Sequence, residues 1–574
     1  MSTSANLSLV HGPTHPPLWT KTLGQVIAEQ ARQYGDKEAV VVPWQATRLT
    51  YRQLAERSKL VAKALLDVGL RHGQCVGIMA GNCYEYIEVF LGGARIGCPV
   101  VVLNTTYSPE EFKSAVSRSS CRVIFVSPTI GSRSLAAHID TLSSIPELQR
   151  VVILGEGETP GLAKETQTYS TFTNGGHSVF LNDAFLRRAE KQVQPSDVLN
   201  LQFTSGTTSL PKAAMLTHIN LINNGRYVGQ AMRLTTDDVI CCPPPLFHCF
   251  GLVMGFLASF THGSTIIFPS AHFNAKQTLD AVVAEKATAL LGVPTMFIAE
   301  LEVMDTEPGK YQINTLRTGL AAGSPVPAPL MHQLREKMRV QGMLIAYGMT
   351  ETSPVTFITS LDDPPEKMAK TLGRVLPHTS AKVIDKHGNI VPRGQRGEIC
   401  TSGFALQTGY WKDEEKTKEA MRRDENGTLW MHTGDEGFID EEGYGHITGR
   451  IKDLIIRGGE NISPTEIEER LIAHPSISEA CVVGLENERY GEVVGAFLRL
   501  AGNTTRKLTD DEVRAWVMEV LGRTKAPQYI FWIGDQEVGA DLPKTGSGKY
   551  KKHLIRGIGN ELVRKLKKTT RAKL

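Results

Sequence analysis

Short apolar segments alternate with helix-forming segments through residues 1–155, and this alternation constrains the fold more than any other feature of the sequence. The apolar runs lie at 75–80, 99–104, 123–126 and 151–154, and each has the length of a buried strand. Thr50 and Gln53 form a capping-box pattern at the start of the helical segment that leads into the first of these runs. Buried strands separated by helices predict a doubly wound parallel sheet.

The rest of the chain divides into three further regions. Residues 156–194 are rich in Gly, Thr and Ser, and we expect an irregular surface excursion there. A second α/β region runs from 198 to 360, and short strands with Gly-marked turns at 371–450 predict a small antiparallel β unit. The segment that follows predicts a separate α/β domain, with a capping box at 463–466 that begins a helix.

The charge distribution argues against a general nucleic-acid-binding protein. The 63 Lys and Arg and 60 Asp and Glu give a net charge of +3. From Lys549 onward the chain carries ten basic residues and one acidic residue, which leaves a net charge of −6 on the rest. A nucleic-acid-binding domain usually spreads its basic side chains over a whole face instead.

Cysteine usage and the N-terminus predict a soluble intracellular protein. The nine cysteines include no C-x-x-C pair, which favours a reducing compartment and argues against zinc or a disulfide framework. The first residues lack the basic and apolar parts of a signal peptide, and no apolar run is long enough for a transmembrane segment.

The segment 201–213, LQFTSGTTSLPKA, has the composition of a phosphate-binding loop. Consecutive hydroxyl residues, one Gly and one Lys can surround phosphates with hydroxyl and N–H donors and a cation. The Walker A spacing is absent, so this is a different kind of loop. The candidate phosphate-binding residues are Thr204, Ser205, Gly206, Thr207, Thr208 and Lys212.

This string resembles the phosphate loop of the adenylate-forming superfamily, which includes acyl-CoA synthetases, aryl-CoA ligases, peptide-synthetase adenylation domains and beetle luciferases. The family pattern is close to [ST]-S-G-[ST]-[ST]-G-x-P-K-G. Ser209 and Ala213 replace two of its glycines, which puts loop flexibility and ATP affinity in question.

Further family motifs follow in the expected order, and the resemblance implies a role for each. His248 would line the acyl pocket and thiol channel. Adenine would bind at Gly323, Ser324 and Pro325 and stack on Tyr347. Thr350 would contact the α-phosphate, and Glu351 would hold Mg²⁺, which suits a hard carboxylate. Asp435 would accept both ribose hydroxyls.

The C-terminal motifs complete the set. Arg450 would contact ribose or phosphate, and Lys452 occupies the family's hinge position. Gly458 and Gly459 would line the pantetheine tunnel with bare backbone. Lys549 matches the catalytic lysine of the terminal motif, in a Gly-flanked loop.

The resemblance therefore implies an ATP-dependent acyl-CoA synthetase that uses ATP, CoA and Mg²⁺. The expected α/β fold has a large N-terminal domain of two doubly wound subdomains plus a small β-barrel-like unit (20–450). A smaller, mobile C-terminal α+β lid domain (451–555) and a basic tail (556–574) follow. Three alternatives stay open: transfer of the acyl group to a carrier protein, an aryl-CoA ligase, and a non-catalytic nucleotide-binding protein.

Substrate and location are less constrained by the sequence. The sequence as a whole resembles medium-chain fatty acyl-CoA synthetases and fungal peroxisomal ligases of specialised metabolism. The resemblance implies a small-molecule carboxylic acid as substrate. The terminal Ala572-Lys573-Leu574 is similar to the peroxisomal S-K-L signal. We therefore expect an import receptor as partner and a peroxisomal location, with the cytoplasm as the alternative.

Overall fold

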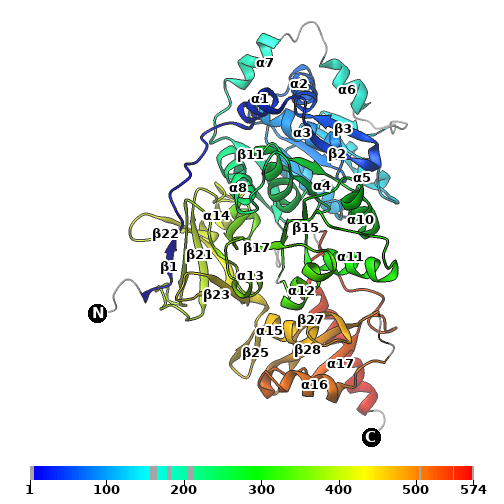
Figure 1. The fold of residues 1–574 in the computed structure, drawn as a ribbon, viewed down its shortest axis with the longest axis vertical. Helices are drawn as coiled ribbons and strands as arrows, with labels where there is room; N and C mark the ends of the chain where they lie inside the picture. The colour runs from blue at the N-terminus through cyan, green and yellow to red at the C-terminus, as the bar shows by residue number, and fades with distance from the viewer. Residues whose placement is uncertain are drawn as a thin grey trace.

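The computed structural model describes residues 6–155, 165–176, 183–204, 211–324, 326–502, 504, 506–546 and 548–571, with side chains described up to residue 566. Figure 1 shows two α/β sheets at the centre and top, an antiparallel sheet at one side, and the C-terminal domain, orange to red, at the bottom. The expected α/β class with a separate C-terminal domain is confirmed.

The first large sheet is parallel except at one edge. Its strands, in order across the sheet, are β10 (Glu165–Thr168), β9 (Arg150–Ile153), β6 (Val123–Val126), β4 (Val76–Met79), β5 (Val100–Val102), β11 (Val198–Thr204) and the antiparallel β12 (Lys212–Thr217). The four apolar runs of the first 155 residues are four of its strands, so the doubly wound prediction is confirmed.

The second large sheet has nine strands with a parallel centre. They are, in order, β19 (Arg374–Val375), β18 (Val355–Ile358), β17 (Gly342–Gly348), β16 (Thr318–Ala322), β15 (Ala289–Gly292), β13 (Val239–Cys241), β14 (Thr265–Ile267), β2 (Glu38–Val42) and β3 (Thr47–Thr50). The two subdomains exchange segments: β2 and β3 come from the start of the chain, while β11 and β12 join the other sheet. The sequence regions 1–155 and 198–360 therefore do not correspond one to one to the two sheets.

The β unit is an antiparallel sheet, as expected. Its strands are β1 (Leu9–His11), β20 (Thr379–Ile384), β21 (Gly397–Gly403), β23 (Leu429–Ile439) and β22 (Met421–Arg423), with β24 (Gly445–Arg450) paired to β23. β1 lies before the expected start of the domain at residue 20, and it pairs with β20 from Leu9 opposite Lys382. Residues 9–11 therefore belong to this sheet.

The C-terminal domain packs three helices around a five-stranded sheet. The strands are β26 (Glu460–Ile462), β25 (Ile455–Arg457), β28 (Gly491–Leu500), β27 (Ile477–Asn487) and β29 (Tyr529–Trp532); the helices are α15 (Pro464–Ile472), α16 (Asp510–Met518) and α17 (Lys552–Arg571). The capping box expected at 463–466 is wrong. Ser463 makes no side-chain cap, because its hydroxyl donates to the Thr448 carbonyl instead.

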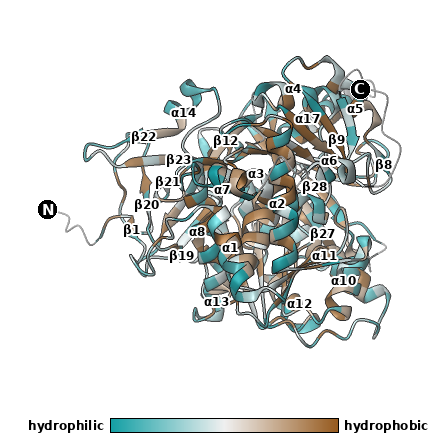
Figure 2. Ribbon diagram, turned by 90° about the horizontal axis from the view of Figure 1, so that it is seen from above, coloured by the Kyte–Doolittle hydropathy of each residue, from teal (hydrophilic) through white to brown (hydrophobic). Residues whose placement is uncertain are grey.

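Helices cover the faces of the large sheets, and their apolar sides turn inward (Figure 2). The helices before the C-terminal domain are α1 (Leu23–Tyr34), α2 (Tyr51–Asp67), α3 (Tyr84–Arg95), α4 (Pro109–Ser119), α5 (Ala136–Thr141), α6 (Tyr169–Gly175), α7 (Asp183–Glu190), α8 (His218–Ala231), α9 (Ala258–Thr261), α10 (Ala275–Ala284), α11 (Pro294–Thr306), α12 (Ala328–Lys337), α13 (Pro365–Lys370) and α14 (Glu414–Ala420). Of these, α14 packs against β22 and β23 of the β unit instead. The capping box of Thr50 with Gln53 is confirmed at the start of α2.

The polar segment that follows β9 is more regular than its composition predicts. The polar segment 156–194 contains β10, α6 and α7, so the irregular excursion expected there is wrong for its described part. Thr168 caps α6 through its side chain.

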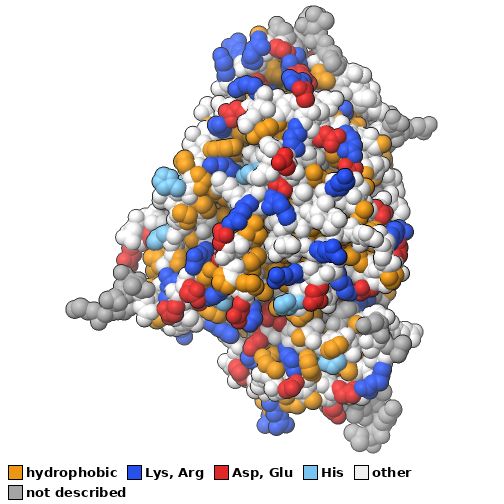
Figure 3. All heavy atoms as spheres, in the orientation of Figure 1, with side chains coloured by type: hydrophobic (Ala, Val, Ile, Leu, Met, Phe, Trp, Pro, Cys, Tyr) orange, Lys and Arg blue, Asp and Glu red, His pale blue; other side chains and the backbone are white. Residues whose placement is uncertain are grey.

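On the face shown in Figure 3, basic and acidic side chains are interspersed. Within the described ranges, no helix combines the length and apolar character that a membrane crossing requires.

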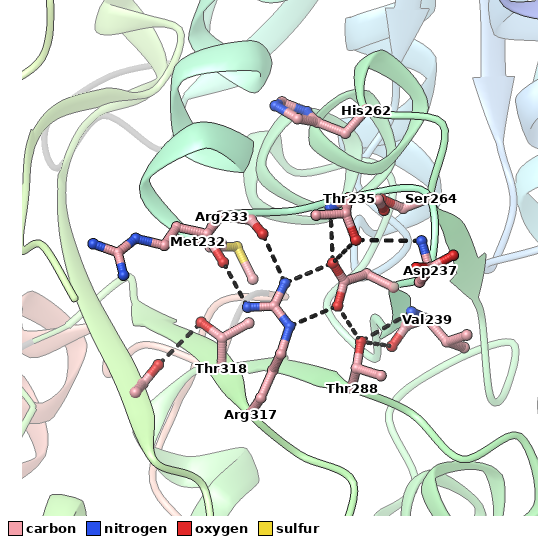
Figure 4. Close-up of polar contacts among 12 residues, drawn as sticks. Met232, Arg233, Thr235, Asp237, Val239, His262, Ser264, Thr288, Arg317 and Thr318 are labelled. Atoms are coloured by element: carbon pink, nitrogen blue, oxygen red, sulfur yellow. Dashed lines mark hydrogen bonds and ion pairs between the residues drawn. The ribbon is translucent and has the colours of Figure 1, made fainter. Parts of the chain in front are cut away.

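An ionic network around the buried Asp238 carboxylate joins the amino ends of three neighbouring parallel strands of the second sheet (Figure 4). Asp238 precedes β13, Thr288 precedes β15 and Arg317 precedes β16. The Asp238 carboxylate accepts from Arg317 Nε at 2.9 Å and Nη2 at 2.6 Å, and from Thr288 Oγ1 at 2.7 Å. Thr235 adds its N–H at 2.7 Å. Burial by itself raises the Asp238 pKa, but these hydrogen bonds outweigh it, and the pKa is lowered.

We predict that Asp238→Asn lowers the free energy of unfolding by about 1–2 kcal/mol, because it weakens the charge-assisted hydrogen bonds from Arg317, whose side chain is 39% exposed and keeps part of its hydration. Urea denaturation at pH 7 measures this. The exposed neighbour Asp237 is the matched control, and Asp237→Asn should change stability by less than about 0.5 kcal/mol. Since the folded-state pKa of Asp238 is lowered, its contribution is present above the unfolded pKa and disappears as the pH falls through the folded one. Equal effects of the two variants would contradict the prediction.

Candidate functional site

The candidate site residues gather where the parallel strands end. Thr204 ends β11, Gly323 and Ser324 follow β16, and Tyr347 lies near the end of β17. The carboxyl edge of an open α/β sheet is where such folds bind ligands, because the loops there are free of ladder pairing.

Lys549 enters this edge from the C-terminal domain. Its N–H donates to Thr545 Oγ1 at 3.1 Å, and its carbonyl accepts from Thr545 N–H at 2.7 Å, which closes a tight turn. A Cβ placed on Gly323 would lie 3.6 Å from Lys549 Cε, so the side chain reaches the end of β16. The adjacent Gly548 has φ +84°, a backbone conformation that favours glycine.

The charges around Lys549 change its protonation. The pKa of its ammonium is lowered to about 8: burial and the nearby Arg450 guanidinium lower the pKa, whereas Asp435 and Glu351 raise it. The lysine is thus held among two carboxylates and one guanidinium. Lys549 and Arg450 together balance the formal charge of the two carboxylates.

Asp435, Tyr347 and Arg450 form one contact group. Asp435 lies on β23 and is 3% exposed. Its carboxylate accepts from Tyr347 Oη at 2.7 Å and pairs with Arg450 Nε, on the adjacent strand β24, at 2.7 Å. Burial raises the pKa of Asp435, and the Arg450 charge opposes that effect.

Glu351 forms a second group with Lys212. Thr350 and Glu351 lie in a short 3-10 helix, η5 (Thr350–Thr352), after β17. Glu351 is 6% exposed, and its Oε1 accepts from Tyr410 Oη at 2.8 Å. Lys212 lies on β12, where it pairs with Thr204 of β11. Its Nζ lies 5.0 Å from the centre of the Tyr410 ring. Tyr410 thus connects the candidate metal ligand with the candidate phosphate-binding lysine.

The phosphate-loop prediction is only partly visible. Thr204 and Lys212 face each other across the β11–β12 hairpin, while Ser205, Gly206, Thr207, Thr208 and Ser209 lie outside the described residues, as does Pro325. Ala213 lies within β12, is 5% exposed and pairs with Phe203. Its side chain therefore packs within the strand that follows the predicted loop.

His248 is placed to donate a hydrogen bond. Its Nδ1 accepts from the Phe250 N–H at 3.1 Å, so in the neutral ring Nε2 carries the proton. Burial lowers the pKa of His248 to about 3, with a further contribution from the Lys549 charge. The imidazole stays neutral at physiological pH and offers an N–H donor. The π-helix η4 (Phe250–Leu257) begins directly after this segment.

Lys452, Gly458 and Gly459 lie on the C-terminal side of the contact. Lys452 is exposed in the 3-10 helix η6 (Ile451–Asp453), between the β unit and the C-terminal domain. Gly458 and Gly459 form the exposed two-residue turn between β25 and β26, with φ +60° and +89°. This hairpin turn requires positive φ at both positions, which explains both glycines in the present domain orientation.

Sequence reasoning missed a pair of residues behind Asp435. Glu398 on β21 accepts from the Gly434 N–H at 3.0 Å and pairs with His432 Nδ1 at 3.0 Å. Gly434 has φ +69° at an irregularity of β23, where the ladder leaves its N–H free for a side chain. Burial by itself raises the pKa of Glu398, but the hydrogen bonds from His432 and Gly434 have the larger combined effect, so the pKa is lowered. The pair holds the backbone that presents Asp435, and strand pairing, not spacing in the sequence, brings it together.

The same pair lies beside a thiol. The donor atoms of Glu398, Cys400 and His432 lie within 4.8 Å of one another. Both Glu398 oxygens already accept hydrogen bonds, and Lys382 and Arg422 add positive charge beside the thiol. Hydrogen bonding therefore explains this cluster, and we assign no cation to it. All nine cysteines are buried free thiols.

Two models of known protein families match the chain. Residues 27–411 match the AMP-binding enzyme family, and residues 466–549 match the AMP-binding enzyme C-terminal domain.

The chain belongs to the AMP-binding enzyme family.

Two relatives and one solved structure illustrate the range of the family. The acyl-CoA ligase sidI of Aspergillus fumigatus is 48% identical over 575 residues, which cover 99% of this chain and 96% of the relative. The medium-chain acyl-CoA ligase ACSF2 of Danio rerio, a mitochondrial protein, is 36% identical over 96% of this chain and 90% of its own length. The anthranilate CoA ligase AuaEII in complex with anthranoyl-AMP has a TM-score of 0.82 at 23% identity over 96% of this chain and 99% of that one, which shows the shared fold.

We predict that nucleotide binding by this AMP-binding enzyme weakens above pH 8, because Lys549 loses the positive charge that attracts phosphate. At pH 7 the ammonium is mostly protonated; at pH 9.5 it is mostly neutral. The affinity for ATP should fall by about tenfold at most for each pH unit above 8, since one proton is linked. Equilibrium dialysis with labelled ATP measures this. Lys549→Ala should bind ATP weakly at both values without the pH step, and a step that persists in this variant would contradict the assignment.

Proposed function

We propose that this protein is an AMP-forming acyl-CoA ligase, which converts a carboxylic acid, ATP and CoA into an acyl-CoA thioester, AMP and pyrophosphate. The observation that carries the proposal is the position of Lys549, which comes from the C-terminal domain and lies among Asp435, Glu351 and Arg450. The names of the relatives, acyl-CoA ligases at 36–48% identity over most of the chain, support the same activity.

In the first step a carboxylate oxygen of the acid attacks the α-phosphorus of ATP, and the bond from that phosphorus to the pyrophosphate oxygen breaks. The acyl-adenylate forms without a protein nucleophile. Negative charge grows on the α-phosphate oxygens, and Lys549 and Arg450 lie where they would offset it. Donors held in place in this way contribute on the order of 2–4 kcal/mol each. The His248 Nε2–H can orient an oxygen of the acid.

Glu351 fits a magnesium ion in its donor chemistry. A buried carboxylate with one oxygen held by Tyr410 is a hard, fixed ligand, and Mg²⁺ commonly binds one or two carboxylates together with substrate phosphates. Bound there, Mg²⁺ would neutralise charge on the phosphate oxygens. Lys212, whose Nζ lies over the Tyr410 ring, would bind a phosphate directly.

In the second step the CoA sulfur attacks the acyl carbon, the bond to the AMP oxygen breaks, and the thiol proton is released to solvent. Lys549 occupies space beside the reacting group in the present orientation. We place the hinge for its withdrawal at the exposed Lys452, and we expect the Gly458-Gly459 turn to approach the thiol path after the C-terminal domain rotates.

The acid is proposed as a medium-chain fatty acid or a specialised-metabolite acid. The zebrafish relative is named a medium-chain ligase, and the Aspergillus relative an acyl-CoA ligase. A panel of aliphatic, hydroxylated and aromatic acids, assayed for AMP release with and without CoA, tests this. Release that depends on CoA supports the ligase; adenylation that CoA does not complete favours transfer to a carrier protein, and a preference for aromatic acids favours an aryl-CoA ligase.

We predict that Lys549→Ala slows adenylation by about a hundredfold or more, because the loss of one preorganised donor costs several kcal/mol in the transition state. Thioester formation from supplied acyl-adenylate should continue at close to the wild-type rate. The two half-reactions are followed as pyrophosphate release and as CoA consumption.

Lys544 is the matched control for this variant. Its Nζ lies 3.3 Å from both Glu479 and Asp541, within the C-terminal domain. Lys544→Ala should leave both half-reactions near wild type. If Lys549→Ala reduced both half-reactions equally, the adenylation role would be wrong.

We further propose that the protein is imported into peroxisomes by a receptor that binds Ala572-Lys573-Leu574, which lie outside the described residues. The support is the similarity of this terminus to S-K-L and the basic residues of α17 that precede it. We predict that a tag fused after Leu574 redistributes the protein to the cytosol, whereas the same tag at the N-terminus does not. Fluorescence microscopy with a peroxisomal marker measures this, and an unchanged punctate pattern with the C-terminal tag would refute the signal.

A further inference from the structure

The loop that carries Lys549 packs closely against the N-terminal domain at a glycine. A Cβ placed on Gly546 would lie 2.5 Å from Asn104 Oδ1, 3.0 Å from Phe247 Cζ and 3.0 Å from Thr106 Cγ2. Contacts under 3.0 Å are not tolerated without movement of one partner. Gly546 does not have a positive φ, so space, not backbone conformation, is what requires glycine here.

The partners of Gly546 are held in place. Asn104 Oδ1 accepts from both the N–H and the hydroxyl of Thr106 at 2.9 Å, which fixes the side chain in a turn. Arg133 donates to the carbonyls of Thr105 and Tyr107 at 2.5 and 2.7 Å. The turn therefore cannot easily yield to a side chain at position 546.

Phe247 is fixed as firmly. It is 8% exposed, and its carbonyl accepts from Gln202 Nε2 at 2.8 Å. Gln202 itself is buried on β11, the strand that leads to the phosphate loop. The surface that faces Gly546 is thus formed by the segments that follow two parallel strands, β5 and β13, and it is part of the rigid edge of the N-terminal domain.

We propose that Asn104, Thr106 and Phe247 form the docking surface for the lysine loop, and that the absence of a side chain at Gly546 sets how far Lys549 enters the site. The proposal rests on the proposed ligase function. Gly546 is a positioning residue: it acts through Lys549, and it matters only in the domain orientation used for adenylation. A side chain there shifts the domain balance toward the orientation used for thioester formation.

The test compares the two half-reactions in Gly546→Ala. We expect pyrophosphate release to fall by about tenfold to a hundredfold, since a displacement of about 1 Å of a catalytic group has effects of that size. CoA consumption from supplied acyl-adenylate should stay at the wild-type rate. Gly522→Ala is the matched control, because a Cβ at Gly522 has no atom within 4 Å. Thermal denaturation shows whether the variants are folded.

A second variant separates packing from a general defect. Asn104→Ala removes the oxygen that a side chain at position 546 would meet, so Gly546→Ala combined with Asn104→Ala should recover part of the lost adenylation rate. Wild-type adenylation in Gly546→Ala, equal loss of both half-reactions, or no recovery in the double variant would each overturn the proposal. Failure of the wild-type protein to release AMP with any acid would instead contradict the ligase function.

Discussion

The burial of the Lys549 ammonium between two domains is the interaction on which the candidate site depends. An ammonium loses hydration when it leaves water, and opposite charges nearby must compensate. Asp435 and Glu351 supply that compensation from the N-terminal part of the chain, and Arg450 partly cancels it. The resulting pKa of about 8 keeps the charge at neutral pH without binding it tightly. A lysine so balanced can attract a phosphate and can also be withdrawn.

The two ends of the strands in the second sheet differ: the amino ends carry a structural network, and the carboxyl ends carry the candidate site. At the amino ends of its strands, Asp238 is saturated with hydrogen bonds from Arg317, Thr288 and Thr235. At the carboxyl ends, the polar groups of the site make fewer mutual bonds and carry opposed charges. The carboxyl ends are where open α/β sheets bind ligands, and the hydrogen bonds of Asp238 hold the opposite ends of three of the same strands in place.

The sequence predicts the local elements and the order of the motifs, because both follow from neighbouring residues. It does not predict which strands become partners: β2 and β3 leave the first region for the second sheet, and β1 joins the β unit. It also misassigned Ser463, whose hydroxyl binds the Thr448 carbonyl once the domains meet. Glu398 carries no signal in the sequence, since its role arises only from the pairing of β21 with β23.

The two glycines of the lysine loop look alike in the sequence and differ in physical cause. Gly548 has φ +84°, so a side chain there strains the backbone in every domain orientation. Gly546 is limited only by its neighbours across the domain boundary, so a side chain there would be costly only while the two domains are in contact at this point. The domain rotation that we propose would need contacts of this second kind, because close packing without a strong bond can position Lys549 and still release it.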